Sequence, residues 1–528
     1  MNRKSGSAPH GKGTANPGGT AIAAVAAISL ITGFGYGMAG CAFAQTLNQG
    51  RQQSSLGAKP SSGGGADTMS YDYTGTYSGA LTADGKSVSS SATTTATKSD
   101  QNAALAQNGG TLTVTNGTLV KSGDSDNADS NNFYGTNSIS LTVGEKSTSI
   151  LDNTTLKATS SGSNAIFATD SGTVLARKPT ISTTAANSRG LDATYGGTIL
   201  AGDVKATTKG DHSATLATDR GGGTISVNGG TLSTAGSGSP LLYSTGDIEV
   251  NGVTGTASGS QIAGMEGLNT ILINDSTLES DVTDATASDP VANGVIIYQS
   301  ASGDAESTTG SAATFQAKDS TLKSAIESGS MFYFTNTKAN VVLSNTTLDF
   351  DSDAAALITA AGNDSNNWGS AGSNGATVVF TGRNQTLKGT VSADTISSVT
   401  LNLLDGSTWT GTASITDNAS AVSGSTSAQP ISVNVDGSST WTVTGNTTVS
   451  ALNVAEGGKV VDANGNTATI VANGKTVAKG TGSVTVTVTG DYGTSVDGDA
   501  DGTTLTDDLI DRSDYDSTFD TSSSWSMS

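Results

Sequence analysis

The chain has 528 residues, of which 34% are hydrophobic, 13% are charged and only 5% are aromatic, and its formal net charge is −21. The low charged fraction argues against ordinary disorder, and the scarcity of aromatic residues argues against a thick globular core. The negative charge opposes contact with phosphate backbones, so we expect no nucleic-acid partner.

Residues 1–44 are predicted to be a secretory signal peptide. Basic residues precede an apolar run at 21–31, and an Ala-Phe-Ala site predicts cleavage between Ala44 and Gln45. The alternatives are a transmembrane anchor and lipidation of Cys41, the single cysteine, which follows a sequence loosely like a lipoprotein box. Cleavage predicts an exported protein with no transmembrane segment in the mature chain, found outside the cell or on the bacterial surface, associated with the outer membrane.

Residues 45–104 are predicted to be a polar, low-complexity lead-in, and a repeat occupies residues 105–490. Its clearest copies lie at 164–176, 189–201 and 213–227, where a short apolar strand, a small polar corner and a second strand return. Intervals of 25 and 26 residues separate Val174, Ile199 and Ile225. A period of this length without a helical pattern is typical of a β-solenoid.

The repeat predicts an all-β fold, a parallel β-helix with inserted loops. Gly and Asn are expected at corners with positive φ, and Leu is expected to stack on Leu between coils, with Thr, Ser and Asn outside. The 22-residue interval from Leu387 to Trp409 predicts a single coil, and the 44-residue interval from Leu278 to Leu322 predicts two.

Four polar insertions are expected to leave the coils as loops, at 124–133, 285–294, 302–312 and 363–375. Trp368 lies in the last of them, and a loop tryptophan is a candidate for contact with a partner. The alternative is that Trp368 covers the edge of a local strand.

Residues 433–461 resemble the last coils of bacterial autotransporter passengers of the pertactin and adhesin type. A Trp-Thr-Val-Thr-Gly run at 441–445 is followed by a Thr-Val turn, a Leu-x-Val strand and a Gly-Gly corner. The resemblance is close over about 30 residues and extends through the repeat only in style. It implies a right-handed parallel β-helix exported to the cell surface for adhesion or aggregation.

Passengers of that family precede an outer-membrane barrel of alternating strands about ten residues long. Residues 491–528 form an acidic tail without that pattern. We therefore expect the translocator barrel to be lacking, with export or anchoring by another route.

The acidic tail contains a candidate calcium loop. Asp497, Asp499 and Asp501 occupy positions one, three and five of a twelve-residue loop, Thr503 would offer its carbonyl at seven, and Asp508 stands at twelve. Alternating carboxylates bring hard oxygen ligands together around Ca²⁺. The alternative is a solvated acidic tail.

No catalytic or cofactor-binding residue is assigned, because the segment after the predicted signal contains a single histidine, His212. The first hypothesis is an adhesin-like structural β-helix protein that binds cell-surface glycans or proteins, host or bacterial, or associates with itself. One alternative is a β-helix enzyme acting on polysaccharides, as a lyase or a hydrolase, and another is a passenger delivered with a separate partner.

Overall fold

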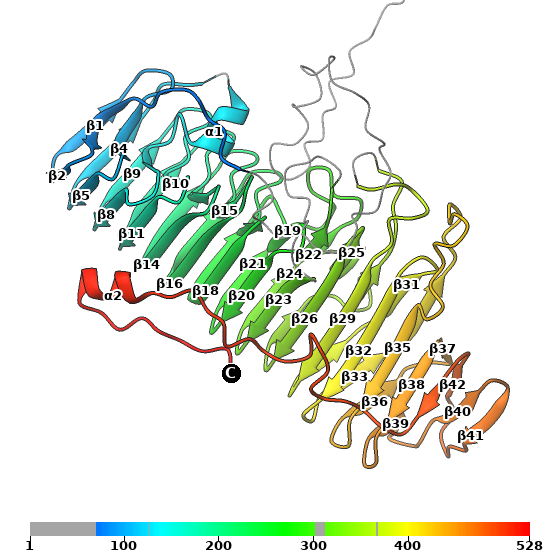
Figure 1. Cartoon of the computed structure of the whole chain (residues 1–528). Coiled ribbons are helices and arrows are strands. Elements are labelled where there is room, and N and C mark those ends of the chain that lie inside the picture. Colours follow the sequence, from blue (N-terminus) through cyan, green and yellow to red (C-terminus); the bar gives the residue numbers. More distant parts are fainter. Residues whose placement is uncertain (1–69, 126, 301–311, 366–367) are drawn as a thin grey trace, which may run out of the picture. The chain divides into compact units, whose positions relative to one another are not determined.

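The computed structural model describes residues 70–125, 127–300, 312–365 and 368–528. The predicted signal peptide, with Cys41 and the Ala44–Gln45 cleavage site, lies outside these residues. The described residues form an all-β parallel β-helix, which confirms the fold class predicted from the repeat. Successive coils run side by side in Figure 1, from the blue N-terminal strands to the orange C-terminal strands.

The first face of the β-helix is a 13-stranded parallel sheet, to which successive coils contribute one strand each from residues 79–84 to residues 413–416. Its strands, in spatial and chain order, are β1 (Gly79–Asp84), β4 (Asn102–Gln107), β7 (Ser140–Val143), β10 (Ile166–Thr169), β13 (Leu191–Ala193), β15 (Leu216–Thr218), β17 (Leu242–Ser244), β19 (Ala263–Glu266), β22 (Asn293–Tyr298), β25 (Ser330–Thr335), β28 (Ala356–Ala360), β31 (Val391–Asp394) and β34 (Ala413–Thr416).

The second face is a 22-stranded sheet that contains two ladders, joined where three long strands continue through both. The first ladder comprises β2 (Ser87–Ser90), β5 (Thr111–Thr115), β8 (Thr148–Asp152), β11 (Thr173–Arg177), the long strands β14 (Gly197–Thr208), β16 (Gly223–Thr234) and β18 (Asp247–Ala257), then β20 (Thr270–Asn274), β23 (Ala313–Lys318), β26 (Lys338–Ser344), β29 (Thr377–Arg383), β32 (Ser398–Leu404), β35 (Ile431–Val435), β38 (Ala451–Val454) and β43 (Tyr492–Gly493).

The second ladder supplies the third side of each coil. It comprises β3 (Thr93–Ala96), β6 (Thr118–Lys121), β9 (Thr155–Ala158), β12 (Thr180–Thr183), the ends of the three long strands, β21 (Thr277–Ser280), β24 (Thr321–Ser324) and β27 (Thr347–Asp349). A four-stranded sheet follows with β30 (Thr386–Lys388), β33 (Thr408–Gly411), β36 (Thr440–Val443) and β39 (Lys459–Asp462). The last four-stranded sheet contains β37 (Thr447–Val449), β40 (Thr469–Ala472), β41 (Lys475–Ala478) and β42 (Thr485–Val488).

The register between coils follows the predicted repeat at most positions. Val174 pairs with Ile199 and Ile199 with Ile225, and Leu387 pairs with Trp409 across a single coil. The expectation for the 44-residue interval was wrong, because Leu278 and Leu322 are direct partners on adjacent strands. The interval of 44 residues between these two leucines is therefore one long coil.

Polar residues at the corners adopt the left-handed conformation that the sequence predicted. Asn116, Asn153, Asp319 and Asn345 have φ of 54°, 48°, 48° and 46°. Asn and Asp tolerate this region because their short side chains bond to the nearby backbone. His212 lies at such a corner too, with φ of 54°.

The core is a thin column of small aliphatic side chains that widens where aromatic rings stack. Trp409 and Trp441 are register partners with no exposed surface, and their rings lie 4.7 Å apart and nearly parallel. Each indole N–H donates to a glycine carbonyl, Gly389 at 2.9 Å and Gly411 at 3.1 Å. Trp441, from the resembling segment 433–461, thus packs in the core against the preceding coil.

One insertion folds differently from the expected loop. Residues 124–133 were expected to be irregular, but α1 (Ala128–Tyr134) begins there, because the Asn127 side chain accepts a hydrogen bond from Ser130 N and Gly135 closes the helix at φ 68°. The first three strands of the β-helix lie at 79–96, inside the predicted lead-in of residues 45–104, and β4 crosses its end at 102–107.

Candidate functional site on the outer face of the 13-stranded sheet

Alternate residues of the 13-stranded sheet point away from the core and form rows along its outer face. One row runs through the register partners Phe167, Asp192, Ala217 and Tyr243. A neighbouring row places Glu266 beside Tyr298. Loops between coils cover much of this face, so its polar residues divide into a buried group and an open group.

The buried group is an ion network on neighbouring coils. The Arg189 guanidinium contacts the carboxylates of Asp192 and Asp219, each at 2.8 Å, and all three side chains are 2% exposed or less. Burial raises the pKa of Asp192, and the attraction of Arg189 offsets part of that rise. Burial alone would lower the pKa of Arg189, but the two carboxylates raise it, so the guanidinium stays charged.

The sequence analysis did not predict this network. The available signal was a charge at a position where the neighbouring copies of the repeat have uncharged residues. Asp192 is in register with Ala217, for example. Because these charges satisfy one another away from solvent, their geometry supports a role in holding coils together rather than contact with a ligand.

Trp368 covers this face instead of projecting from it. Its side chain is 5% exposed and its ring lies 4.1 Å from that of Tyr298, which donates a hydrogen bond to the Glu266 carboxylate at 3.0 Å. Asn374 donates to the carbonyl of Trp368 at 2.9 Å and so closes the loop. The residue that the sequence offered for partner contact therefore lies beneath the surface.

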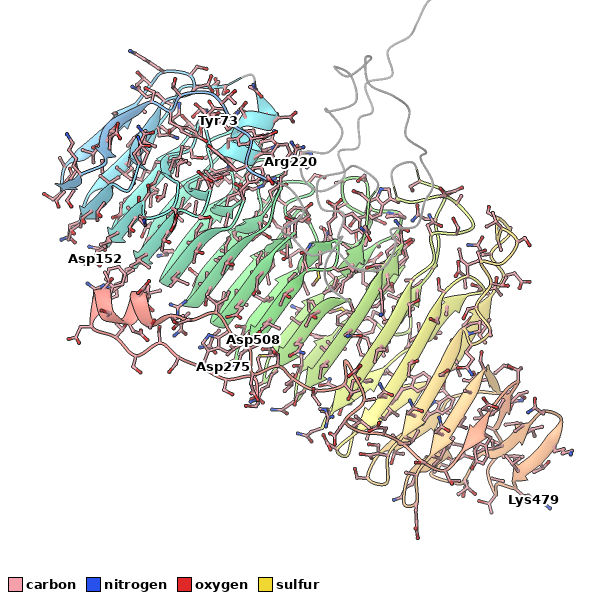
Figure 2. The ribbon with its side chains drawn as sticks, viewed as in Figure 1. Tyr73, Asp152, Arg220, Asp275, Lys479 and Asp508 are labelled. Atoms are coloured by element: carbon pink, nitrogen blue, oxygen red, sulfur yellow. The ribbon has the colours of Figure 1, made fainter. Side chains whose placement is uncertain are left out.

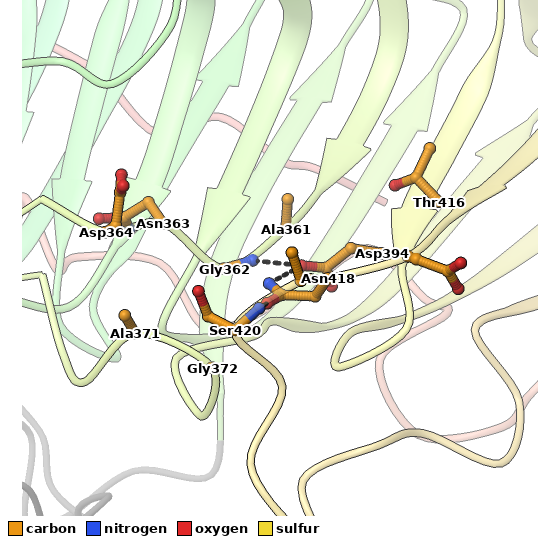
Figure 3. Close-up of a pocket in the computed structure, with 12 residues that line it drawn as sticks. Ala361, Gly362, Asn363, Asp364, Ala371, Gly372, Asp394, Thr416, Asn418 and Ser420 are labelled. Atoms are coloured by element: carbon orange, nitrogen blue, oxygen red, sulfur yellow. Dashed lines mark hydrogen bonds between the residues drawn. The ribbon is translucent and has the colours of Figure 1, made fainter.

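An open, oxygen-rich pocket of about 300 Å³ lies at the C-terminal end of this face, between residues 361–364 and 371–372 on one side and residues 416–420 on the other (Figure 3). Its rim contains the exposed residues Asp364, Asp417 and Ser420. No lining residue has a positive charge. The pocket therefore offers hydrogen-bond acceptors and hydroxyl groups and favours neutral or cationic ligands over anionic ones.

Asp394 organises the pocket from beneath. It is 4% exposed, and its carboxylate accepts hydrogen bonds from Gly362 N at 2.9 Å and Asn418 Nδ2 at 2.7 Å (Figure 3). The Asn418 side-chain oxygen in turn accepts from Ser420 N at 3.0 Å. One buried carboxylate thus fixes both loops, which leaves the rim side chains presented on a rigid frame.

The predicted calcium loop lies on the C-terminal segment, away from this pocket. The Asp497, Asp499, Asp501 and Asp508 side chains are exposed, while Thr503 is buried. The Thr503 carbonyl, which was predicted to be the ligand at position seven of the loop, accepts a hydrogen bond from the guanidinium of Arg383 at 2.7 Å. Across the described ranges no group of three or more His, Cys, Asp or Glu side chains is placed to hold a metal ion. Calcium binding here stays a prediction.

Comparison with family models, curated proteins and solved structures gives no significant match in any of the three searches. Within the described part of the chain, no helix has both the length and the apolar character needed to cross a membrane.

Proposed function

We propose that the protein is an adhesin-like structural β-helix protein, secreted or exposed on the bacterial surface, that mediates cell-surface contact or aggregation. The observation that carries the proposal is the open pocket framed by Asp394 on the outer face of the 13-stranded sheet. A stacked array of coils gives such a pocket a rigid support and a long polar surface for additional weak contacts.

The chemistry of the rim favours glycans without negative charge. Carboxylates at Asp364 and Asp417 and the hydroxyl of Ser420 can bond to sugar hydroxyl groups or to an amino-sugar ammonium. Sulfated or uronic glycans would meet like charge in the pocket and on a protein with a net charge of −21. Neutral and amino sugars are therefore the proposed ligand class.

A glycan array followed by calorimetry with the full chain tests this proposal. We expect neutral or amino glycans to bind, and Asp417→Ala to weaken binding about tenfold, because hydrogen bonds to charged groups contribute about 1.5–3 kcal/mol. Asp349→Ala, an exposed acidic position on β27, is the matched control and should leave binding unchanged. Equal affinity in both variants would remove the pocket from the proposal.

Export and relationship to passengers belong to the same proposal. The stacked Trp409–Trp441 pair and the parallel coils support an autotransporter-like passenger, and the predicted signal peptide supports export. Cell fractionation with an antibody against the β-helix should locate the protein in the medium or at the outer membrane. Recovery only from the cytoplasm would contradict this part.

A polysaccharide-active enzyme is the second candidate, and the clustered carboxylates of the same pocket favour it. Incubation with polysaccharides separates the two candidates. Shortened chains that accumulate with the wild type, and not with Asp417→Ala, would indicate an enzyme. Binding without any change in chain length would indicate an adhesin.

A further inference from the structure

The outer face of the 22-stranded sheet differs from the polar outside that the repeat predicted. The outward row of its first ladder runs through the register partners Leu175 and Leu200, then Glu249 and Leu272 further along. Leu175, Leu200 and Leu272 are 4%, 3% and 1% exposed although they point away from the core. Something covers them.

The cover is the C-terminal segment, residues 494–528. It leaves β43 and returns along this face toward the early coils, ending in α2 (Ser513–Phe519) and a short tail (Figure 1). Figure 2 marks Asp508 on this segment. Its hydrogen bonds join residues far apart in sequence: Gln316 Nε2 donates to Thr504 O at 3.1 Å, and Thr506 N donates to Gln316 Oε1 at 2.9 Å.

Arg512 is the central anchor of the segment. It is 4% exposed, and its guanidinium donates to the Ser226 carbonyl at 2.8 Å, the Ala201 carbonyl at 2.9 Å and Ser523 Oγ at 2.9 Å. The first two acceptors belong to adjacent coils. We call the surface around these sheet carbonyls the socket and Arg512 the anchor. The planar guanidinium has several donors in fixed directions that match these acceptors, and a lysine ammonium would not reproduce the hydrogen bonds.

Aromatic side chains of α2 occupy the apolar part of the row. Tyr515 and Phe519 are buried in one cluster with Leu175 and Leu200. Gly202 makes room for Tyr515, because a Cβ atom at this position would lie 2.1 Å from the Tyr515 hydroxyl oxygen and 2.9 Å from the ring carbon that bears it. The segment and the sheet face are thus complementary in shape as well as in polarity.

All of these contacts join the C-terminal segment to the sheet through side chains and single hydrogen bonds, so the segment can leave without breaking a β-ladder. Residues 494–528, which are described throughout, contain no strand and form no ladder with the sheet. The four residues between β43 and Gly498 are a short hinge, and exchange of an identical element across a short hinge is a low-cost route to self-association. Every copy of the chain has both the socket and the anchor, so a second copy is the partner whose chemistry matches.

We propose that the outer face of the 22-stranded sheet is a self-association surface, on which the C-terminal segment of a second copy docks in place of the chain's own segment. Arg512 and Gly202 are the key residues on the two sides. This surface is separate from the glycan pocket. It rests on the aggregation part of the proposed function, and its test does not involve glycans.

A cross-linking experiment on the full chain tests the exchange. Asn228 Nδ2 donates to the Ser523 carbonyl at 3.1 Å, so these positions lie together when the segment is docked. In a Cys41→Ser background, one preparation has Asn228→Cys and the other Ser523→Cys, and a short bismaleimide, which adds to one thiol at each end, is supplied after the two are mixed and warmed. A cross-linked heterodimer is expected, since only docking between copies joins the two thiols. The double variant reports docking within one copy.

Three outcomes test whether the C-terminal segment is exchanged between copies. Efficient internal cross-linking in the double variant without any heterodimer in the mixture overturns the proposal. Heterodimer formation that falls about tenfold when Arg512→Ala is added to the Ser523→Cys copy supports it, because the lost bonds involve a charged donor. Gly202→Ala on the Asn228→Cys copy should act likewise. Gly445→Ala, at an open site, is its control, and unchanged yield in both anchor variants would also overturn the proposal.

Discussion

Protonation of Glu249 should control how firmly the C-terminal segment is docked. Glu249 is fully buried beneath the segment, and its carboxylate accepts a hydrogen bond from Ile510 N at 2.9 Å. Burial raises the pKa of Glu249 from 4.5 to about 8, and the nearby carboxylates of Asp247 and Asp508 add to the rise, while the Ile510 N–H and Arg512 oppose it. Docked Glu249 is therefore protonated at neutral pH.

The sign of the pH dependence follows from this raised pKa. Below pH 4.5 Glu249 is protonated whether the segment is docked or released, and docking has its full strength. As the pH rises toward 8, only the released state loses the proton, so docking weakens by about 1.4 kcal/mol per pH unit and levels off above 8. The upper bound of the total loss is about 5 kcal/mol. Asp247, whose pKa burial raises to about 7, shifts docking in the same direction.

Hydrogen exchange of residues 509–523, corrected for intrinsic exchange rates, measures this opening equilibrium. We expect the opening constant to rise up to about tenfold per pH unit in the wild type. Glu249→Gln keeps the side chain neutral and should flatten much of that slope, whereas Glu456→Gln, at an exposed position, should not. An identical slope in the wild type and in Glu249→Gln would refute the assignment to Glu249.

Four further predictions concern the core, two ion pairs and the acidic loop. Trp441→Ala should destabilise the β-helix by about 3–5 kcal/mol in calorimetry, because it leaves a cavity beside Trp409. Arg189→Met should cost about 3–5 kcal/mol at neutral pH, because it removes the buried cation that the carboxylates of Asp192 and Asp219 both contact, and acid should restore part of the loss by protonating them. Arg177→Ala breaks the more exposed ion pair with Asp152. It should lower the free energy of unfolding, measured in urea, by about 1 kcal/mol or less. For calcium, titration calorimetry should give heat with the wild type and less with Asp499→Ala, and absence of heat in the wild type would refute that prediction.

The coil architecture could be predicted from the sequence because each coil repeats the same residue types at nearly the same spacing. Corner residues such as Asn116 and Asn345, and stacked positions such as Val174 and Ile199, repeat at the spacing of one turn. Where a coil contains an insertion, the interval between stacked residues grows with the length of the insertion, so it no longer gives the number of coils. The interval between Leu278 and Leu322 was misread for this reason.

The candidate site was less predictable, because it depends on contacts between loops of different coils. Nothing in the local sequence around Asp394 announces that it bonds to Gly362 and Asn418. For Trp368 the sequence left open partner contact or cover of a strand edge, and its burial depends on packing against Tyr298 of an earlier coil. Composition identified the loops, and the packing of loops on the sheet decided which of them remain open.

The net negative charge of the tail favours a solvated segment, but the structure shows the tail docked on the sheet. The chain has only 25 Lys and Arg residues against 46 Asp and Glu, yet three arginines meet at the contact between the tail and the sheet. Arg383 binds the Thr503 carbonyl, Arg177 donates to the Phe519 carbonyl at 3.1 Å, and Arg512 enters the socket at Ser226. Backbone carbonyls accept these bonds, so the guanidinium groups hold the path of the tail and not its many carboxylates. A tail that was solvated throughout would leave Leu175 and its neighbours facing water, which is why we treat residues 494–528 as a docked element of the fold.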